Sequence, residues 1–546
     1  MTDMTNRTDG APRMQVYTGG RIFTAGARPW ASAIVVHDER ILYVGDDATA
    51  ARIAAPDAER TDLAGRVVLP GFVDGHAHVV ETGKAARQVD LWGAGDLDEI
   101  RSRISSAAAQ NPAAPRVFAQ GWQHSAIDGA PDRRLLDDMV ADRPLYLQAH
   151  DLHSIWLNTA ALAEVGIDEA TESPAGGRIH RDAAGRLTGV VDEIAMHQLV
   201  WGVLDSFATE DDNDAAVRTA LAGYRASGVT AATDMALDEA QLAALRRVLQ
   251  AGELTARITA HWLVHPTGDL DENLAQVARA AELLAEGDDD WLRVVGVKLM
   301  VDGTVDGCTA AVRTPYVNGA LPEAIWSLDD LAPVVAAADA AGLKVAMHAI
   351  GDEAVRIAIA AVERAIAVNG PRSRRHRIEH LEVVDPEEIE RLAALGIVAS
   401  MQPVHSDPAI QANWREMLGD ERVERGYPWP EMTDQGARLV FGTDSPTSPF
   451  APLPNMFIAS TRRSALDPSL EPNLARYALP LTDAIRHATA DAAWACGAEG
   501  RYGSLAAGLY ADFVVLDRDV FDAAPEVLLE ARVVTTVVGG RRLHAV

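Results

Sequence analysis

Two histidines separated by one residue, His76 and His78, close an apolar run that begins at Leu69. In an extended strand alternate side chains point to the same side, so both imidazoles would face one point at the end of the strand. Imidazole nitrogen is a common ligand of zinc and related divalent ions. Because 16 histidines in 546 residues also produce such pairs by chance, the pair gains meaning only from the residues that accompany it.

Four polar residues downstream each end a short apolar run of their own: Lys298, His348, His380 and Asp444. Runs of aliphatic and β-branched residues without alternation are typical of strands that are buried on both faces, as in a parallel sheet. In barrels built from such strands, the chemistry gathers at their carboxyl ends. We therefore expect these four side chains to converge with the histidine pair.

Counting backward from Asp444, the sequence contains eight candidate strands, at residues 67–73, 229–234, 258–262, 294–300, 344–348, 377–380, 397–402 and 438–443. Alanine-rich helical patterns at residues 331–341, 353–368 and 386–395 separate the later ones. Repeated βα units of this length predict an α/β fold, a (β/α)8 TIM barrel over residues 69–499.

The two ends of the chain carry further strand patterns, at residues 15–24, 33–36 and 41–45 and in two runs within 512–544. Neither end makes a stable sheet alone, so residues 14–68 and 500–546 are expected to form one composite β-sandwich domain. Two separate terminal decorations are the alternative. The polar residues 1–13 are expected to be a disordered N-terminus.

Residues 80–225 separate the first two barrel strands, a length far beyond an ordinary βα loop. Strand patterns at 116–120 and 145–148 indicate a folded insertion lobe, which we expect to cover the active site because it leaves from the catalytic face. Four polar residues of this lobe could contact substrate or simply pack within it: His124, His150, His153 and Glu193.

Composition narrows the class of partner. The formal charge of −30 argues against a nucleic-acid or anionic-membrane partner, because such a surface repels phosphates. The two cysteines, Cys308 and Cys496, are too few for a disulfide framework, and we expect both to be buried. Without a secretory-type apolar segment near the start or a long apolar span, the expected location is cytoplasmic.

Taken in order, the motifs resemble those of the amidohydrolase superfamily, specifically its amidohydrolase-3 branch. The matching segments are residues 70–78 (PGFVDGHAH), 185–190 (GRLTGV), 297–304 (VKLMVDGT), 348–352 (HAIGD), 378–380 (IEH), 441–446 (FGTDSP), 503–505 (GSL) and 512–516 (DFVVL). They span nearly the whole chain. The resemblance extends to metal-dependent hydrolases such as N-substituted formamide deformylases.

That resemblance implies a site with two divalent metal ions, zinc first, with manganese, iron or nickel as alternatives. His76, His78 and Asp444 would bind the more buried ion, and His348 and His380 the more exposed one. Lys298 would be N6-carboxylysine, carbamylated by carbon dioxide and bridging the two ions.

The implied reaction is hydrolysis of a C–N bond in a small linear amide, N-substituted formamide or carbamate by a metal-bound hydroxide, with Asp444 as general base and acid. A mononuclear deaminase, a decarboxylase and, less favoured, a non-catalytic binding protein are the alternatives on the same barrel. Homo-oligomerisation is left open, because no motif bears on it.

Individual residues keep alternatives of their own. Lys298 could be unmodified, in a one-metal site or as a substrate contact. His348 and His380 could be core histidines bonded to backbone, and Asp444 could cap a helix beginning at Ser445. The sequence does not decide whether Asp302 is a loop cap or a substrate contact.

Overall fold

The computed structural model describes residues 14–123, 126–127, 129–149, 154–174, 177–192, 195–287, 289–411 and 413–546. The expected N-terminal tail at residues 1–13 and the four lobe residues His124, His150, His153 and Glu193 lie outside these ranges. The chain divides into two compact units, one formed by Met1–Val79 with Leu221–Val546 and the other by Val80–Ala220. Each is described by itself.

Eight parallel strands form the central sheet of the first unit, which confirms the predicted barrel. In sheet order they are β8 (Phe72–Ala77), β15 (Val229–Leu237), β16 (Arg257–Leu263), β17 (Leu292–Met300), β18 (Lys344–Ala349), β19 (Arg377–His380), β20 (Val398–Met401) and β21 (Leu439–Phe441). Most of their residues are buried on both faces, which explains why the sequence shows continuous apolar runs. Lys298 lies on the fourth strand, as predicted.

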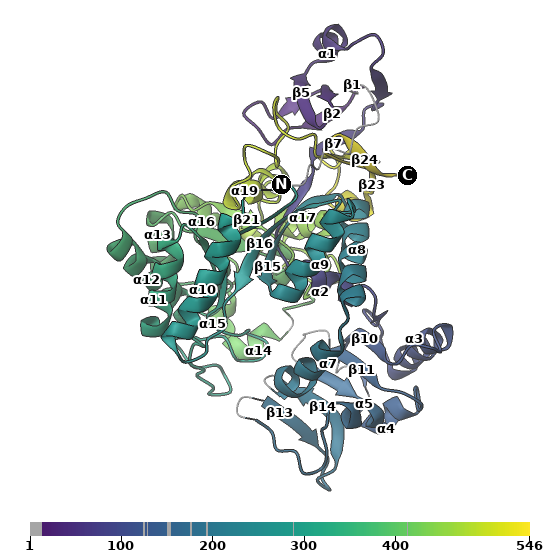
Figure 1. Cartoon of the computed structure of the whole chain (residues 1–546), viewed down its shortest axis with the longest axis vertical. Helices are drawn as coiled ribbons and strands as arrows, with labels where there is room; N and C mark the ends of the chain where they lie inside the picture. The colour runs from purple at the N-terminus through teal and green to yellow at the C-terminus, as the bar shows by residue number, and fades with distance from the viewer. Residues whose placement is uncertain are drawn as a thin grey trace. The chain divides into compact units, whose positions relative to one another are not determined.

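Helices follow most barrel strands: α9 (Glu239–Gln250), α10 (Leu270–Ala285), α11 (Leu328–Ala340), α12 (Asp352–Asn369), α13 (Pro386–Ala394), α16 (Trp429–Asp434), α17 (Pro452–Thr461), α18 (Leu481–His487) and α19 (Ala490–Ala495). Figure 1 shows α10, α11 and α12 along the outside of the barrel. Asp238, Asp269 and Ser327 begin three of them by accepting hydrogen bonds from first-turn N–H groups. Shorter pieces are η3 (Pro403–Ser406), α14 (Trp414–Leu418), α15 (Asp420–Val423) and η4 (Ala475–Tyr477).

The barrel closes where its first strand meets its last. The Asp74 carboxylate on β8 accepts hydrogen bonds from the Thr443 N–H (2.9 Å) and the Thr443 hydroxyl (2.5 Å), just beyond β21. Backbone bonds continue the contact, from Asp444 N to His76 O (2.7 Å) and from His78 N to Ser445 O (2.9 Å). This edge therefore carries the predicted metal ligands on both of its sides.

Two glycines allow that close approach. A Cβ atom at Gly75 would lie 2.5 Å from the Phe441 carbonyl oxygen, and one at Gly442 would lie 2.3 Å from the His76 nitrogen. Both distances are shorter than van der Waals contact, so any side chain here would push the two strands apart. The glycines of the two motifs are thus required by packing.

The chain ends build two further sheets. One has the order β5-β4-β1-β6 and the other β24-β23-β22-β7-β2-β3, so N-terminal and C-terminal strands share the second sheet. The strands are β1 (Met14–Thr18), β2 (Arg21–Phe23), β3 (Trp30–Ala31), β4 (Ala33–His37), β5 (Arg40–Gly45), β6 (Glu59–Asp62), β7 (Val67–Pro70), β22 (Phe513–Leu516), β23 (Val533–Val538) and β24 (Arg541–Ala545), with helices α1 (Asp47–Ile53) and α20 (Val527–Glu530). In Figure 1 purple β7 and yellow β23 and β24 lie in the same part of the molecule, and β22 stands between β7 and β23 in the sheet.

A shared core joins these two sheets. Tyr17 and Ile34 come from the first, Phe513 and Val537 from the second, and all four are buried in one apolar cluster. The Tyr17 and Phe513 rings meet edge to face with their centroids 5.0 Å apart. The expected β-sandwich built from both ends is confirmed, and two separate terminal decorations are excluded.

Three details of the prediction are wrong. Residues 67–73 do not form the first barrel strand: the run breaks at Gly71, whose N–H bonds Asp512 O (3.0 Å), so β7 joins the terminal sheet and β8 begins the barrel. The C-terminal tail contains three strands rather than two. Cys496 is buried as expected, but Cys308 is only partly so.

The second unit is a folded lobe, as its internal patterns predict. Its sheet has the order β13-β14-β12-β11-β10-β9, with mixed pairing, and a core that contains Trp122, Leu147 and Trp156. The strands are β9 (Val89–Asp90), β10 (Val117–Trp122), β11 (Leu145–Ala149), β12 (Ser154–Leu157), β13 (Gly177–Arg181) and β14 (Leu187–Asp192). The helices are α3 (Leu97–Gln110), α4 (Arg133–Asp137), α5 (Thr159–Glu164), η2 (Met196–Trp201) and α7 (Gly202–Phe207), with α2 (Val79–Ala85) and α8 (Glu210–Ser227) at its ends. That the lobe covers the active site stays a prediction.

Among the described residues, no helix combines the length and the apolar character that crossing a bilayer requires.

Candidate metal centre

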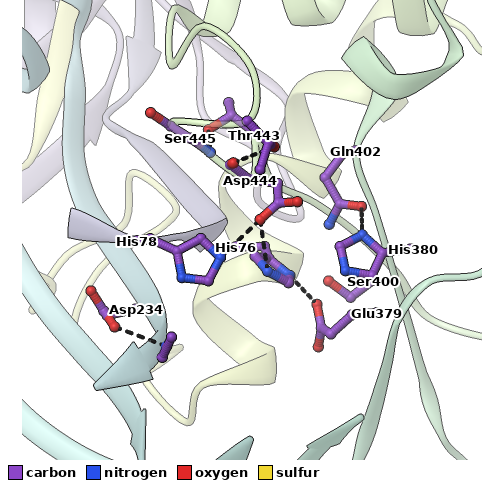
Figure 2. Close-up of polar contacts among 12 residues, drawn as sticks. His76, His78, Asp234, Glu379, His380, Ser400, Gln402, Thr443, Asp444 and Ser445 are labelled. Atoms are coloured by element: carbon purple, nitrogen blue, oxygen red, sulfur yellow. Dashed lines mark hydrogen bonds and ion pairs between the residues drawn. The ribbon is translucent and has the colours of Figure 1, made fainter. Parts of the chain in front are cut away.

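His76, His78 and Asp444 meet at the closing edge of the barrel. The Asp444 Oδ1 atom lies 3.2 Å from His76 Nε2 and 3.0 Å from His78 Nε2. Figure 2 shows both imidazoles turned toward this carboxylate. Ligands bound at about 2.1 Å in tetrahedral geometry are about 3.4 Å apart, so these atoms would need to move apart by only a few tenths of an ångström to form a coordination shell. The predicted convergence of these three side chains is present in the structure.

The Asp444 backbone is held in an unusual conformation. Its φ angle is +57°, in the left-handed region that non-glycine residues rarely adopt. Such strain persists where the surroundings over-determine it, and it clusters at functional sites. Asp444 does not cap a helix, because a turn from Thr447 N to Asp444 O (2.9 Å) follows it and the next helix, α17, begins at Pro452. The helix-cap alternative is wrong.

A buried carboxylate fixes the orientation of His76. His76 Nδ1 donates to Glu379 Oε2 over 2.6 Å, and Glu379 Oε1 in turn accepts from Arg377 Nε over 2.5 Å. Burial alone would raise the pKa of Glu379, but Arg377 and His76 outweigh it and hold this pKa well below its usual range. With Nδ1 protonated toward a carboxylate, the Nε2 lone pair faces the centre.

The orientation of the His380 ring is also fixed by a hydrogen bond, in this case to an amide side chain. Its Nδ1 atom donates to Gln402 Oε1 over 2.9 Å, which leaves Nε2 for the centre. The His380 ring centroid lies 5.0 Å from that of His76 and 4.3 Å from that of His348. Burial and the nearby Lys298 ammonium lower the pKa of His348 to about 3, so this imidazole is neutral, as a metal ligand must be.

Lys298 is buried in the barrel interior with no hydrogen-bond partner for Nζ among the described residues. Burial lowers its pKa to about 8, although the Glu379 and Asp444 carboxylates act in the opposite direction. A buried ammonium without a partner is costly, whereas the neutral amine is the form that adds to the carbon of carbon dioxide. The surroundings of Lys298 therefore suit the expected modification.

Asp302 joins two loops. Its carboxylate accepts from the backbone N–H groups of Ala311 (3.0 Å), Ile350 (3.0 Å) and Gly351 (2.8 Å), so it pins the loop after β17 to the end of β18. Its Oδ1 atom also lies 3.5 Å from His348 Nε2. Because Asp302 is only 1 % exposed, the structure favours the loop-cap interpretation over a substrate contact.

Two residues that sequence reasoning missed adjoin this cluster, namely Glu382 and His405. With His380 they form a second group whose ligand atoms all lie within 4.8 Å of one another. His405 lies in η3 beyond β20, and Glu382 lies two residues beyond β19. Neither is the last residue of its strand, so a search of strand ends does not reach them. Motif spacing offers no other signal.

Comparison with known proteins agrees with this geometry. The sequence pattern of the amidohydrolase family matches residues 59–544. Protein LONG AFTER FAR-RED 3 of Arabidopsis thaliana is 29 % identical over 96 % of this chain and 91 % of its own length. N-substituted formamide deformylase of Arthrobacter pascens is 28 % identical over 93 % of this chain and 94 % of its own.

A solved structure shows the same fold. It is an uncharacterized metal-dependent hydrolase from Pyrococcus furiosus, 28 % identical, with a TM-score of 0.76 over 93 % of this chain and 100 % of that one. The order of the motifs, the barrel and the family match over most of the chain are mutually consistent. The chain therefore belongs to the amidohydrolase family, in its amidohydrolase-3 branch, and is a metal-dependent hydrolase of that family.

Proposed function

We propose that this chain hydrolyses the C–N bond of a small linear amide, an N-substituted formamide or a carbamate. The observation that carries the proposal is the arrangement of His76, His78 and Asp444. Their nitrogen and carboxylate atoms face one point at the seam of the barrel, the closing edge where β8 meets β21. The relative named N-substituted formamide deformylase supports the substrate class. The partner is thus a small molecule, and the strongly acidic chain suits neither a nucleic acid nor an anionic membrane.

The residues present fit a divalent metal centre, with zinc as the first choice. Imidazole and carboxylate are zinc's usual ligands, and the orphaned Nζ of Lys298 is the kind of buried polar atom that a bridging N6-carboxylysine would satisfy. The proposed ligands are His76, His78, Asp444, His348, His380 and Lys298. Bound there, such ions supply a Lewis acid and lower the pKa of a water ligand to about 7.

The role of Asp444 follows from its two oxygens. Oδ1 faces His76 and His78, while Oδ2 points away from them toward His405, 3.7 Å from its Nε2. Burial would raise the pKa of Asp444, but His76 and the other imidazoles hold it well below the usual range, so the carboxylate is ionised and can accept a proton. We assign Oδ2 as the atom that takes a proton from water and passes it to the departing amine nitrogen.

The test combines metal analysis with a substrate panel. We expect purified enzyme with bound metal to release amine from N-substituted formamides, linear amides or carbamates. Asp444→Asn should lose at least a hundredfold in kcat/KM while retaining its fold by circular dichroism. His37→Asn, at a half-exposed histidine of β4, is the control and should leave turnover unchanged.

Other products would favour the rival functions. Ammonia released from a ring substrate would indicate a deaminase, and carbon dioxide released from an acid would indicate a decarboxylase. A fully metallated protein without turnover of any C–N substrate would contradict the proposal and favour a binding role.

A further inference from the structure

We propose that Glu382 and His405 bind the same metal ion as His380, as ligands additional to those that the family resemblance implies. This inference rests on the proposed metal-dependent function and specifies where its more exposed ion lies. The ion would be held near the ends of β19 and β20, where Glu382 and His405 add one carboxylate and one imidazole to the His380 imidazole. Both donor types are usual for zinc.

The backbone after β19 is bent in a way that places Glu382 beside His380. His380 has a φ angle of +76° and Leu381 one of +51°, so two successive non-glycine residues lie in the left-handed region. Leu381 N bonds Ala349 O over 3.2 Å, which anchors this bend to β18. Strain of this kind persists only where surrounding contacts over-determine it, and it is characteristic of functional sites.

The spacing of the atoms fits shared coordination of one ion. Glu382 Oε1 lies 3.4 Å from His405 Nδ1, a distance at which the two side chains also form an ion pair. Two ligands of a tetrahedral zinc ion are separated by about 3.4 Å. The group formed by His76, His78 and Asp444 shows comparable separations of 3.2 and 3.0 Å.

The free nitrogen of His380 points to the same group. Gln402 occupies its Nδ1 atom, so Nε2 is the only atom that His380 can offer to an ion. The rings of His380 and His405 lie nearly parallel: the angle between their planes is 10°, and their centroids are 5.8 Å apart. The side chains of Glu382 and His405 are 7 % and 15 % exposed, so the pair is largely desolvated yet reachable from the solvent.

Metal content, measured independently of activity, tests this assignment. Wild-type protein and the variants Glu382→Gln and His405→Gln are dialysed against zinc, and bound metal is counted by mass spectrometry. Competition with a chromogenic chelator gives the affinity of each ion. We expect two ions per wild-type chain and, in both variants, loss of one ion or at least a tenfold weaker second ion. Cobalt-substituted protein should show a changed visible spectrum in both variants.

Asp491→Asn is the matched control. Asp491, in α19, pairs with His487 of α18 over 2.9 Å and lies 3.7 Å from Arg438, just before the start of β21, so its removal breaks a similar histidine–carboxylate pair at the other end of that strand from Asp444. Unchanged metal count and affinity in Glu382→Gln and His405→Gln would overturn the inference and leave the proposed function standing. The inference would also be overturned if wild-type protein bound only one ion, and if His78→Asn lost that ion while Glu382→Gln kept it. Wild-type protein that binds no ion would contradict both this inference and the proposed function.

Discussion

At the scale of single residues, the centre is prepared by hydrogen bonds on the far side of each imidazole. Glu379 holds Nδ1 of His76, and Gln402 holds Nδ1 of His380, so both rings present Nε2 inward before any ligand arrives. A fixed tautomer and a fixed ring plane reduce the cost of ordering on binding. Sequence reasoning located the imidazoles from strand ends, and Glu379 and Gln402 lie within the same motif and candidate strand, but the sequence does not show which imidazole each one contacts.

Replacing Glu379 by glutamine should therefore weaken the centre without removing a ligand. The amide still accepts from His76 but loses its charge, and Arg377 is left buried beside it without a counter-ion. We expect metal affinity to fall by about 10- to 100-fold, with a lower melting temperature. Glu388→Gln, at a buried glutamate paired with Arg391, is the control. Equal affinity in wild type and Glu379→Gln would refute the positioning role.

Lys298 gives a pH-dependent prediction. Because burial lowers its pKa to about 8, the neutral amine fraction grows as the pH rises through 8, and carbamylation of the metal-free protein should grow with it. Protein equilibrated with ¹³C-labelled bicarbonate should show a carbamate resonance that increases between about pH 7 and 9. Lys298→Ala should abolish that signal, whereas Lys344→Ala should keep it. A resonance that persists in Lys298→Ala would place the carbamate elsewhere.

At the scale of elements, the apolar runs predicted most of the barrel, and the polar residues at their ends predicted most of the metal centre. The apolar runs located the later strands almost to the residue, because parallel barrel strands are buried on both faces. The first strand was misplaced because residues 67–73 read as one apolar run, although the Pro70-Gly71 dipeptide, which commonly interrupts a strand, marks the boundary between the two sheets. His405 was missed for a related reason, since its position in η3 depends on how the chain turns after β20.

Asp74 is the element-scale contact with the clearest consequence. Its carboxylate ties β8 to Thr443, so Asp74→Asn removes charge from the bonds that close the barrel. We expect the free energy of unfolding to fall by about 1–3 kcal/mol. Metal affinity should fall as well, because Thr443, which Asp74 holds in place, directly precedes Asp444. Urea titration and chelator competition measure the two effects.

Asp339→Asn separates these effects. Asp339 is buried beside Arg374 at 2.8 Å, away from the centre. That variant should lose stability but keep its metal affinity. If Asp74→Asn retains wild-type affinity despite its lower stability, closure of the barrel and formation of the centre are not coupled.

At the scale of the whole molecule, the first and last barrel strands supply the ligands of one proposed ion, and both chain ends share one sheet. Metal that binds only the folded state stabilises it by about 4 kcal/mol at a thousandfold excess over Kd. Chelation should therefore lower the melting temperature, and added zinc should restore it.

The His78→Asn variant is the control for that measurement. Its melting temperature should respond less to either treatment than that of wild-type protein, because it lacks a ligand of the ion between β8 and β21 but keeps the proposed ligands of the second ion. Identical melting curves for wild-type protein with and without chelator would show that no ion joins the two strands.

The seam between β8 and β21 also has a consequence for biosynthesis. His76 and His78 leave the ribosome early, whereas Asp444 is added only after all eight barrel strands have been made. A nascent chain therefore carries two exposed imidazoles without their carboxylate for most of its synthesis, and selective ion capture must wait until translation is nearly finished.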